Sequence, residues 1–278
     1  MTETKRTTSP AAAQEGGDTV KIRIRGLVKS FGPKKVLDGV DLDIQKAESL
    51  VIIGGSGTGK SVLLKHIIGL LKPDAGTVEI DGVAMESLSN RELTEFRRRF
   101  GMSFQEGALF DSMTVGENVG FPLARQSKMN AAERRTRVEE CLELVRLSGV
   151  ADKLPSQLSG GMRRRVGFAR AIAVEPEILL FDEPTTGLDP VTTALIDEVI
   201  IDLNDRLHST TITITHDMES AFRIGDRIAM IHQGKIVAEA APEEFRHHAD
   251  PRVQQFIHGI ADGPLNAPNG ESAAVSKK

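Results

Sequence analysis

The sequence contains a glycine-rich octapeptide, Gly54-Gly55-Ser56-Gly57-Thr58-Gly59-Lys60-Ser61. It matches the pattern G-x-x-x-x-G-K-[ST] and stands between an apolar run at residues 50–53 and a helical stretch at residues 61–71. Glycines allow successive backbone N–H groups to converge on phosphate oxygens, and the N-terminus of a following helix adds its dipole. We expect Lys60 to reach the β- and γ-phosphates of a nucleotide and the Ser61 hydroxyl to ligate Mg²⁺. The octapeptide, called the phosphate loop below, therefore predicts a nucleotide site.

Two acidic residues, Asp182 and Glu183, end a second apolar run at residues 178–181. Ligands of open α/β sheets bind at the carboxyl ends of the strands, so we expect both carboxylates to face the phosphate loop. Asp182 is expected to hold the Mg²⁺ shell, and Glu183 to polarise the water that attacks the γ-phosphate. The alternative is a solvated acidic turn before Pro184.

The alternation of strand and helix patterns predicts an α/β fold. Residues 50–53, 178–181 and 211–215 are unbroken apolar or β-branched runs, which are typical of central parallel strands covered on both faces. Residues 20–24 and 77–80 alternate apolar with polar side chains and predict antiparallel strands. Apolar spacing predicts helices at residues 138–145 and, after Pro190, at 195–207. The region at about 106–174 is mostly helical and is inserted between the strand-bearing halves.

Composition excludes several classes of protein. The 278 residues include 35 Lys and Arg against 39 Asp and Glu, a net charge of -4, which argues against a dedicated nucleic-acid binder. Eighteen consecutive apolar residues occur nowhere, and residues 1–17 contain no apolar signal core, so we expect a cytoplasmic location. Cys141 is the only cysteine, which excludes an intrachain disulfide and a cysteine-based zinc site.

The pentapeptide Leu158-Ser159-Gly160-Gly161-Met162, called the signature segment below, points to a family. With it, the chain resembles the ATP-binding subunit of ABC transporters from about residue 20 to residue 263. Ser159 is a good N-cap for a helix at residues 161–174, and the two glycines leave backbone N–H groups open to an anion. The resemblance implies that Ser159, Gly160 and Gly161 face the γ-phosphate bound by a second copy of the chain. A capped structural helix is the alternative.

The resemblance also implies an architecture and further site residues. The fold would be a P-loop NTPase core of the ABC type, with an antiparallel β subdomain and an inserted helical subdomain. Gln105, after a strand at residues 101–104, would contact Mg²⁺ and sense the permease. Asp189 would cross the dimer interface, and His216 would contact the γ-phosphate. Phe31 stands where the family usually stacks a tyrosine on adenine, and a core phenylalanine is the alternative.

Within the family, the chain looks like the ATPases of phospholipid and Mce-type (Mla-like) lipid transport. Met162 in place of the usual glutamine, Arg163-Arg164-Arg165 after it, and the segments at residues 105–111, 250–256 and 262–264 carry this likeness. A second departure, Thr186-Gly187 in place of Ser-Ala, is assigned no chemical effect. We expect the arginine triplets at residues 97–99 and 163–165 to be solvated or packing faces beside carboxylates, not a surface for nucleic acid.

The family resemblance implies an ATP hydrolase that uses ATP and Mg²⁺, dimerises around ATP and drives a separate membrane permease from the cytoplasmic side of the inner membrane. A small accessory subunit and a lipid-binding Mce-type component are further expected partners. One alternative is an ABC importer ATPase for another substrate, such as a polar amino acid. Another is a soluble ABC ATPase acting on ribosomes or DNA. The single phosphate loop, and the 54 positions from Gln105 to Ser159, argue against the latter.

The expected domains are a flexible lead at residues 1–18, the ATP-binding domain at 19–248 and a C-terminal extension at 249–278. In the extension, helical spacing of Val253, Phe256, Ile257 and Ile260 predicts a short amphipathic helix, followed by a loose tail. This apolar stripe either packs on its own domain or, as the lipid-transport resemblance suggests, docks on the partner copy or an accessory subunit.

Overall fold

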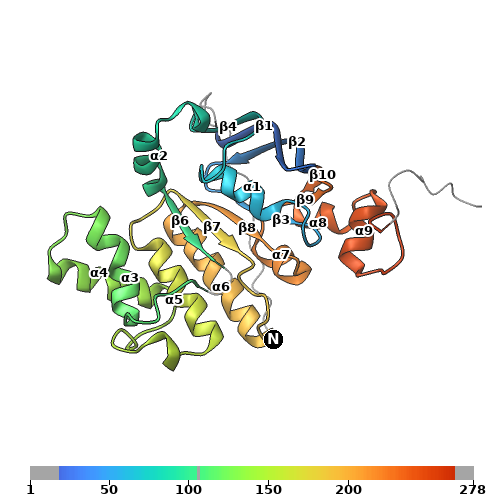
Figure 1. Cartoon of the computed structure of the whole chain (residues 1–278). Coiled ribbons are helices and arrows are strands. Elements are labelled where there is room, and N and C mark those ends of the chain that lie inside the picture. The colour runs from blue at the N-terminus through green and yellow to red at the C-terminus, as the bar shows by residue number, and fades with distance from the viewer. Residues whose placement is uncertain (1–18, 105–106, 267–278) are drawn as a thin grey trace, which may run out of the picture.

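In the computed structural model, which describes residues 19–104 and 107–266, the three apolar runs pair as neighbours in one six-stranded sheet (Figure 1). β3 (Ser49–Ile53) lies next to β8 (Thr210–Ile214), which lies next to β7 (Ile178–Asp182), and both pairs are parallel. The order of the whole sheet is β10-β9-β3-β8-β7-β6. Its remaining strands are β6 (Phe100–Ser103), β9 (Arg227–His232) and β10 (Lys235–Ala240), of which only β10 is antiparallel to its neighbour.

The central strands β3, β7 and β8 consist mainly of buried apolar and β-branched residues because both faces of this sheet are covered. Along β3, Leu50 and Ile52 face one hydrophobic cluster, whereas Val51 and Ile53 face the other. The second cluster continues into α6 (Pro190–Leu207), α7 (Met218–Ile224) and the helical region, and the first continues into α1 (Lys60–Ile67) and a second sheet. The predicted α/β class with a central parallel core is confirmed.

The second sheet is antiparallel, with the order β2-β1-β4-β5. Its strands are β1 (Val20–Phe31), β2 (Lys34–Gln45), β4 (Ala75–Ile80) and β5 (Val83–Ala84). The alternation in the sequence predicts β1 and β4, but it does not predict β2. In β2 the buried residues Leu37 and Val40 are three positions apart, because Gly39 (φ 78°) lies at a register shift against β1. This irregularity hides the period-2 pattern.

The helical region lies beside the β6 edge and is coloured green to yellow-green in Figure 1. It contains α3 (Val115–Gln126), α4 (Ala131–Leu144) and α5 (Gly160–Ile172). Capping boxes begin two of these helices, Thr114 with Glu117 and Asn130 with Glu133. A short 3₁₀ turn, Pro155–Gln157, lies between α4 and α5. Outside this region, α2 (Asn90–Phe96) follows the antiparallel sheet and is flanked by 3₁₀ turns at Met85–Ser87 and Arg97–Arg99.

Helix α1 is shorter than predicted, since it ends at Ile67 and not near residue 71. Gly69 has a φ of 67°, and a Cβ at this position would lie 2.6 Å from Cδ1 of Leu93. The turn therefore packs closely against α2, which a sequence pattern does not reveal.

The C-terminal helices are α8 (Pro242–Arg246) and α9 (Pro251–His258). Val253 of α9 is fully buried in the same hydrophobic cluster as Phe245, and Phe256 and Ile257 pack partly against it. Ile260, the last member of the predicted stripe, is 52% exposed. Most of the stripe thus packs on its own domain.

Across the described ranges, 19–104 and 107–266, no helix combines the length and apolar character needed to cross a bilayer.

A cluster of charges joins the two sheets. Nζ of Lys21, on β1, lies 2.8 Å from the carboxylate of Asp81 and 2.5 Å from that of Glu177. Arg99 contacts both carboxylates, with Nη2 2.6 Å from Glu177. One arginine of the first triplet is therefore a packing residue beside carboxylates, as expected.

Candidate functional site

The phosphate loop connects β3 to α1, with three of its glycines at positive φ: Gly54 at 153°, Gly57 at 74° and Gly59 at 112°. A Cβ at Gly54 would lie 2.4 Å from the carbonyl oxygen of Ile231, and one at Gly59 would lie 2.8 Å from a methyl of Leu37. Gly54 and Gly59 are thus required both for backbone conformation and for space. Thr58 closes the loop by donating from Oγ1 to the carbonyl of Gly55 at 2.9 Å.

Lys60 folds back over this loop. Its Nζ donates to the carbonyl oxygens of Gly54 at 2.7 Å and Gly55 at 3.0 Å, and the residue is 8% exposed. Burial lowers the pKa of Lys60, and the nearby charges of Glu183 and Asp182 oppose that shift. A buried ammonium held only by carbonyl oxygens can exchange them for the charged oxygens of a phosphate.

Asp182 lies at the carboxyl end of β7, facing the start of α1. Burial raises the pKa of Asp182, as does the charge of Glu183, whereas Lys60 and a hydrogen bond with Ser61 lower it. The Ser61 hydroxyl and the Asp182 carboxylate are oxygen ligands of the kind that Mg²⁺ takes. Among the described residues no cluster of three His, Cys, Asp or Glu side chains could hold a metal. The two oxygen donors of Ser61 and Asp182 fit a Mg²⁺ ion whose other ligands are phosphate oxygens and water.

Glu183 occupies a left-handed backbone conformation, with φ at 51°, and its N–H donates to the carbonyl of Ile214 at 2.9 Å. Its side chain is 17% exposed. Oε2 lies 2.8 Å from Nδ1 of His216 and accepts a hydrogen bond of 2.9 Å from Oγ1 of Thr186. An uncommon backbone conformation of this kind is frequent where a side chain must be aimed.

Most of these groups line one cleft of about 620 Å³, although Asp182 does not. The lining comes from the phosphate loop after Gly55, the start of α1 and the segments that follow β7 and β8, with the residues Val36, Ser56, Gly57, Gly59, Lys60, Ser61, Val62, Glu183, Thr186 and His216. A lysine, a hydroxyl, a carboxylate and a histidine close to a helix N-terminus are groups suited to binding and hydrolysing a nucleoside triphosphate.

The signature segment lies elsewhere. Ser159 caps α5, and its Oγ accepts the N–H of Met162 at 3.3 Å, as predicted for an N-cap. Gly160 lines a separate pocket of about 510 Å³ with Leu188. A Cβ at Gly161 would lie 2.5 Å from Cγ2 of Thr192. The glycine at position 161 therefore has a packing reason within this chain.

Two other predicted site residues, Asp189 and Phe31, do not line the cleft. Asp189 caps α6 and accepts the N–H groups of Val191 and Thr192, both at 3.0 Å. Phe31, at the end of β1, is 49% exposed and does not belong to the core, and it is not among the residues that line the cleft. Gln105 lies outside the described residues.

Two residues, one in the cleft lining and one on α5, make contacts that the sequence does not predict. Thr186 bonds Glu183, and Arg164 of α5 donates to the carbonyl of Thr186. The only signal available for Thr186 is its hydroxyl three positions after a catalytic-type carboxylate. For Arg164 the helical spacing gives no signal, because its partner is a backbone group in another segment.

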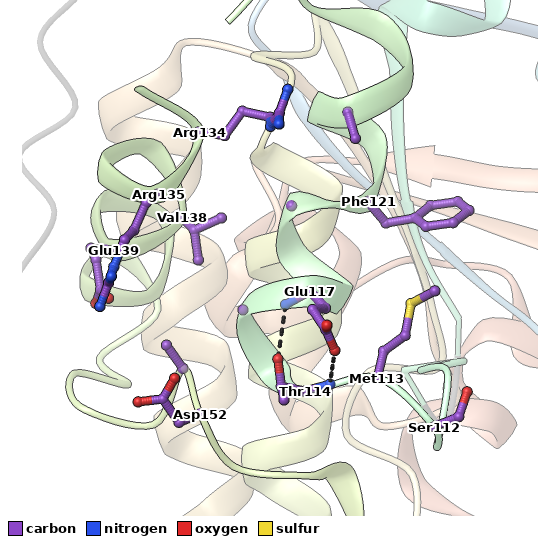
Figure 2. A pocket seen from close by; sticks show the side chains of 14 residues that line it. Ser112, Met113, Thr114, Glu117, Phe121, Arg134, Arg135, Val138, Glu139 and Asp152 are labelled. Atoms are coloured by element: carbon purple, nitrogen blue, oxygen red, sulfur yellow. Dashed lines mark hydrogen bonds between the residues drawn. The ribbon is translucent and has the colours of Figure 1, made fainter. Parts of the chain in front are cut away.

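A larger hollow, about 800 Å³, lies between α3 and α4 (Figure 2). Figure 2 shows the Thr114–Glu117 capping box at one end of it, with Arg134 and Arg135 on the α4 side. The hollow shares no lining residue with the cleft at Lys60 and contains no phosphate loop. It is therefore not the nucleotide site.

Comparison with known proteins identifies the family. A family profile described as ABC transporter matches residues 37–186. The probable ribonucleotide transport ATP-binding protein mkl of Mycobacterium leprae is 43% identical over 88% of this chain and 71% of its own length. The intermembrane phospholipid transport system ATP-binding protein MlaF of Haemophilus influenzae is 41% identical, over 88% of this chain and 92% of its own length.

A solved structure extends the match to the fold. It is the post-hydrolysis dimer of an ATP-binding cassette bound to ADP and Pi, with a TM-score of 0.73 and 36% identity over 80% of this chain and 98% of that one. This confirms the predicted ABC-type architecture with its antiparallel β subdomain, and the main sheet is mixed. The chain belongs to the ABC transporter family and is an ABC-type ATPase, the ATP-hydrolysing subunit of a transporter.

Proposed function

We propose that this ATPase subunit powers phospholipid transport across the cell envelope. The observation that carries the proposal is the near-complete alignment with proteins named for intermembrane phospholipid transport, which covers 92% of MlaF from Haemophilus influenzae and 91% of MlaF from Escherichia coli. The mkl proteins, named for probable ribonucleotide transport, are 42–43% identical but are covered over 71–72% of their length. Transport of a ribonucleotide is therefore the second candidate.

The proposed chemistry uses the groups of the cleft. Lys60 and the N–H groups of the phosphate loop bind the β- and γ-phosphates, and Ser61 and Asp182 hold the Mg²⁺ that screens their charge. Glu183 accepts a proton from the water that attacks the γ-phosphorus, and His216 orients Glu183 through the 2.8 Å contact. Phe31 and Gln105 would complete the site, at the adenine and at the permease side, respectively.

The proposed assembly contains two copies. Ser159, Gly160 and Gly161 do not line the cleft of their own chain, and related cassettes have been solved as dimers. We infer that each signature segment closes the cleft of the partner, with Asp189 near the interface. In this proposal residues 19–248 are the ATP-binding domain, and the dimer sits on a membrane permease at the cytoplasmic face of the inner membrane. A small accessory subunit and an Mce-type lipid-binding component complete the complex.

The enzymatic part of the proposal is tested with Glu183→Gln. The amide keeps size and polarity but cannot accept the proton, so we expect ATP and Mg²⁺ to bind while hydrolysis nearly stops. Sedimentation of the full chain with ATP and Mg²⁺ should then show a stable dimer. The wild-type chain, which turns ATP over, is the control. A variant that stays monomeric with bound ATP, or that hydrolyses ATP at the wild-type rate, would contradict the composite site.

The substrate is tested on the complex taken from membranes. We expect mass spectrometry to find glycerophospholipids enriched in the complex relative to the bulk membrane, and vesicles of these lipids to stimulate ATP hydrolysis. Stimulation by ribonucleoside monophosphates, with no enriched lipid, would overturn the lipid assignment and favour the second candidate. Both outcomes leave the Glu183 experiment unaffected.

A further inference from the structure

A chain of hydrogen bonds connects helix α5 with the carboxylate of Glu183. Arg164, in the second turn of α5, donates from Nη2 to the carbonyl oxygen of Thr186. The hydroxyl of Thr186 donates to Oε2 of Glu183 at 2.9 Å, and Nδ1 of His216 lies 2.8 Å from the same oxygen. Arg164 is only 9% exposed, and Thr186 is part of the cleft lining.

The two contacts on Glu183 define the position of its carboxylate. Both end on Oε2 and come from two different segments, Thr186 in the loop after β7 and His216 after β8. A carboxylate held by two donors on one oxygen loses rotational freedom about its last torsion angle. Its second oxygen, Oε1, can then accept a proton from a water in a fixed direction.

The loop that carries Thr186 is itself held in place. The backbone of Glu183 is anchored to Ile214 of β8, and the Thr186 carbonyl is anchored to Arg164 of α5. The long Arg164 side chain loses conformational entropy when it is buried. Its hydrogen bond to the Thr186 carbonyl offsets that loss and stabilises the loop. The Thr186 hydroxyl reaches Glu183 only while the loop keeps this conformation.

We propose that Thr186 is a positioning residue for Glu183, and that Arg164 holds Thr186 from the signature helix. This inference rests on the proposed function, in which Glu183 activates water and α5 closes the cleft of the partner copy. Within one chain, α5 then serves one ATP and Glu183 serves the other. The Arg164–Thr186 contact therefore couples the two ATP sites. When α5 moves as it engages the ATP of the partner copy, the contact transmits this movement to Glu183, which acts on the ATP in the cleft of its own chain.

The first test removes the hydroxyl and keeps the shape. Thr186→Val should lower kcat of ATP hydrolysis about tenfold with little change in KM. The variant lacks a hydrogen bond to the charged carboxylate of Glu183, which acts in the chemical step and not in ATP binding. Thr186→Ser keeps the hydroxyl and should restore most of kcat. The role of Thr186 is overturned if Thr186→Val has wild-type kcat, or if Thr186→Ser is as slow as Thr186→Val.

The second test concerns Arg164, with the next residue as a matched control. Arg165 also donates to backbone carbonyls, at 2.8 Å to Arg146, but these belong to the helical region and not to the cleft. Arg164→Gln should lower kcat and spare ATP affinity, whereas Arg165→Gln should leave kcat unchanged. In the double variant with Arg164→Gln and Thr186→Val, the factor by which kcat falls should be smaller than the product of the factors in the two single variants. Equal effects of the two arginine variants, or multiplying losses, would overturn the coupling.

Failure of this inference is distinguishable from failure of the proposed function. If Glu183→Gln hydrolyses ATP at the wild-type rate, Glu183 does not activate water, and both the proposed role and the inference fall. If Glu183→Gln stops hydrolysis but Thr186→Val is as fast as wild type, only the inference falls.

Discussion

Nδ1 of His216 lies 2.8 Å from Oε2 of Glu183, although 33 positions separate the two residues in the sequence. The contact follows from the pairing of two parallel strands. Asp182, the last residue of β7, is in register with Ile214, the last residue of β8. The segments that leave these strands are therefore side by side, and the contact forms in the chain without a partner copy. The register between β7 and β8 therefore brings Glu183 and His216 together at this edge of the sheet.

His216→Ala should slow hydrolysis without weakening ATP binding. Glu183 loses one of the two groups that orient it, while Lys60 and the phosphate loop keep their contacts with the nucleotide. We expect kcat to fall by about a hundredfold. Titration with a fluorescent ATP analogue and steady-state kinetics check the two parts. A parallel loss of affinity would show that His216 acts mainly in ground-state binding.

Lys60→Ala should act earlier, on nucleotide affinity. The lysine is buried over the loop, and no other side chain of the cleft lining supplies its positive charge to the β- and γ-phosphates. We expect ATP affinity to fall at least about tenfold.

Ser159→Arg should instead spare ATP binding by the isolated chain and stop hydrolysis, because the new side chain blocks the contact with the partner.

Mixing Lys60→Ala with Ser159→Arg tests the composite site. A heterodimer of the two places both lesions in one site and leaves the other site intact. Partial recovery of hydrolysis is expected if one intact site can turn over, and none if both must act together. Recovery to the full wild-type rate would be incompatible with the proposed interface.

Gly161→Ala should destabilise the isolated chain. Its Cβ would lie 2.5 Å from Cγ2 of Thr192, an overpacked contact that costs about 1–3 kcal/mol. Thr192→Ala removes the methyl group and should recover most of the loss. Gly160→Ala is the matched control, since its Cβ would meet only Leu188 at 3.7 Å. Urea denaturation measures all three. If the Thr192 change gives no recovery, the cost at Gly161 arises from its backbone.

The Glu177 ion pairs should make stability depend on pH in the acidic range. Hydrogen bonds from Arg99, and then from Lys21, lower the pKa of Glu177 from 4.5 to about 2. A carboxyl with a lowered pKa stabilises the fold above its unfolded value and loses that contribution as the pH falls through its folded value. The side chain is half exposed, so solvent screening limits its contribution to about 1 kcal/mol.

Glu177→Gln removes this dependence. The difference in free energy of unfolding between wild type and Glu177→Gln should therefore be constant above pH 4.5 and shrink between pH 4.5 and about 2. Urea unfolding at a series of pH values measures it. Curves that stay parallel through this range would show that the charge cluster does not hold Glu177 ionised.

Truncation after His248 should lower the melting temperature of the isolated chain. It removes Val253, whose full burial contributes about 1.5–3 kcal/mol, from the cluster that contains Phe245. The nucleotide cleft is distant in sequence and shares no residue with α9, so ATP affinity should survive. Ile260→Ser, at a position 52% exposed, should leave the melting temperature unchanged. A truncated chain as stable as wild type would return α9 to an intermolecular role.

The features of the fold and site that the sequence predicts are those encoded by residues that are adjacent in the chain. β3 and β7 are short, unbroken apolar runs, and Lys60 and Ser61 belong to a contiguous motif, so one window of sequence is enough for each. The N-cap Ser159 is likewise local. The roles proposed for these residues remain predictions.

The remaining features depend on contacts between distant segments. β2 escapes prediction because Gly39 shifts its register, and α1 ends early because Gly69 packs on Leu93. Thr186 reaches Glu183 only because the backbone of Glu183 takes a left-handed conformation anchored to Ile214. The likeness to lipid-transport ATPases does not predict that most of the α9 stripe packs in its own core.

Strand β3, whose alternate residues enter two different hydrophobic clusters, has a thermodynamic consequence for the whole chain. One cluster contains the antiparallel sheet and the other contains the helical region, and the phosphate loop begins where β3 ends. Neither cluster can melt without exposing one face of β3 to water, so we expect the two halves to unfold as a single cooperative unit. A nucleotide bound at the end of this strand consequently raises the unfolding free energy of both halves by the same amount.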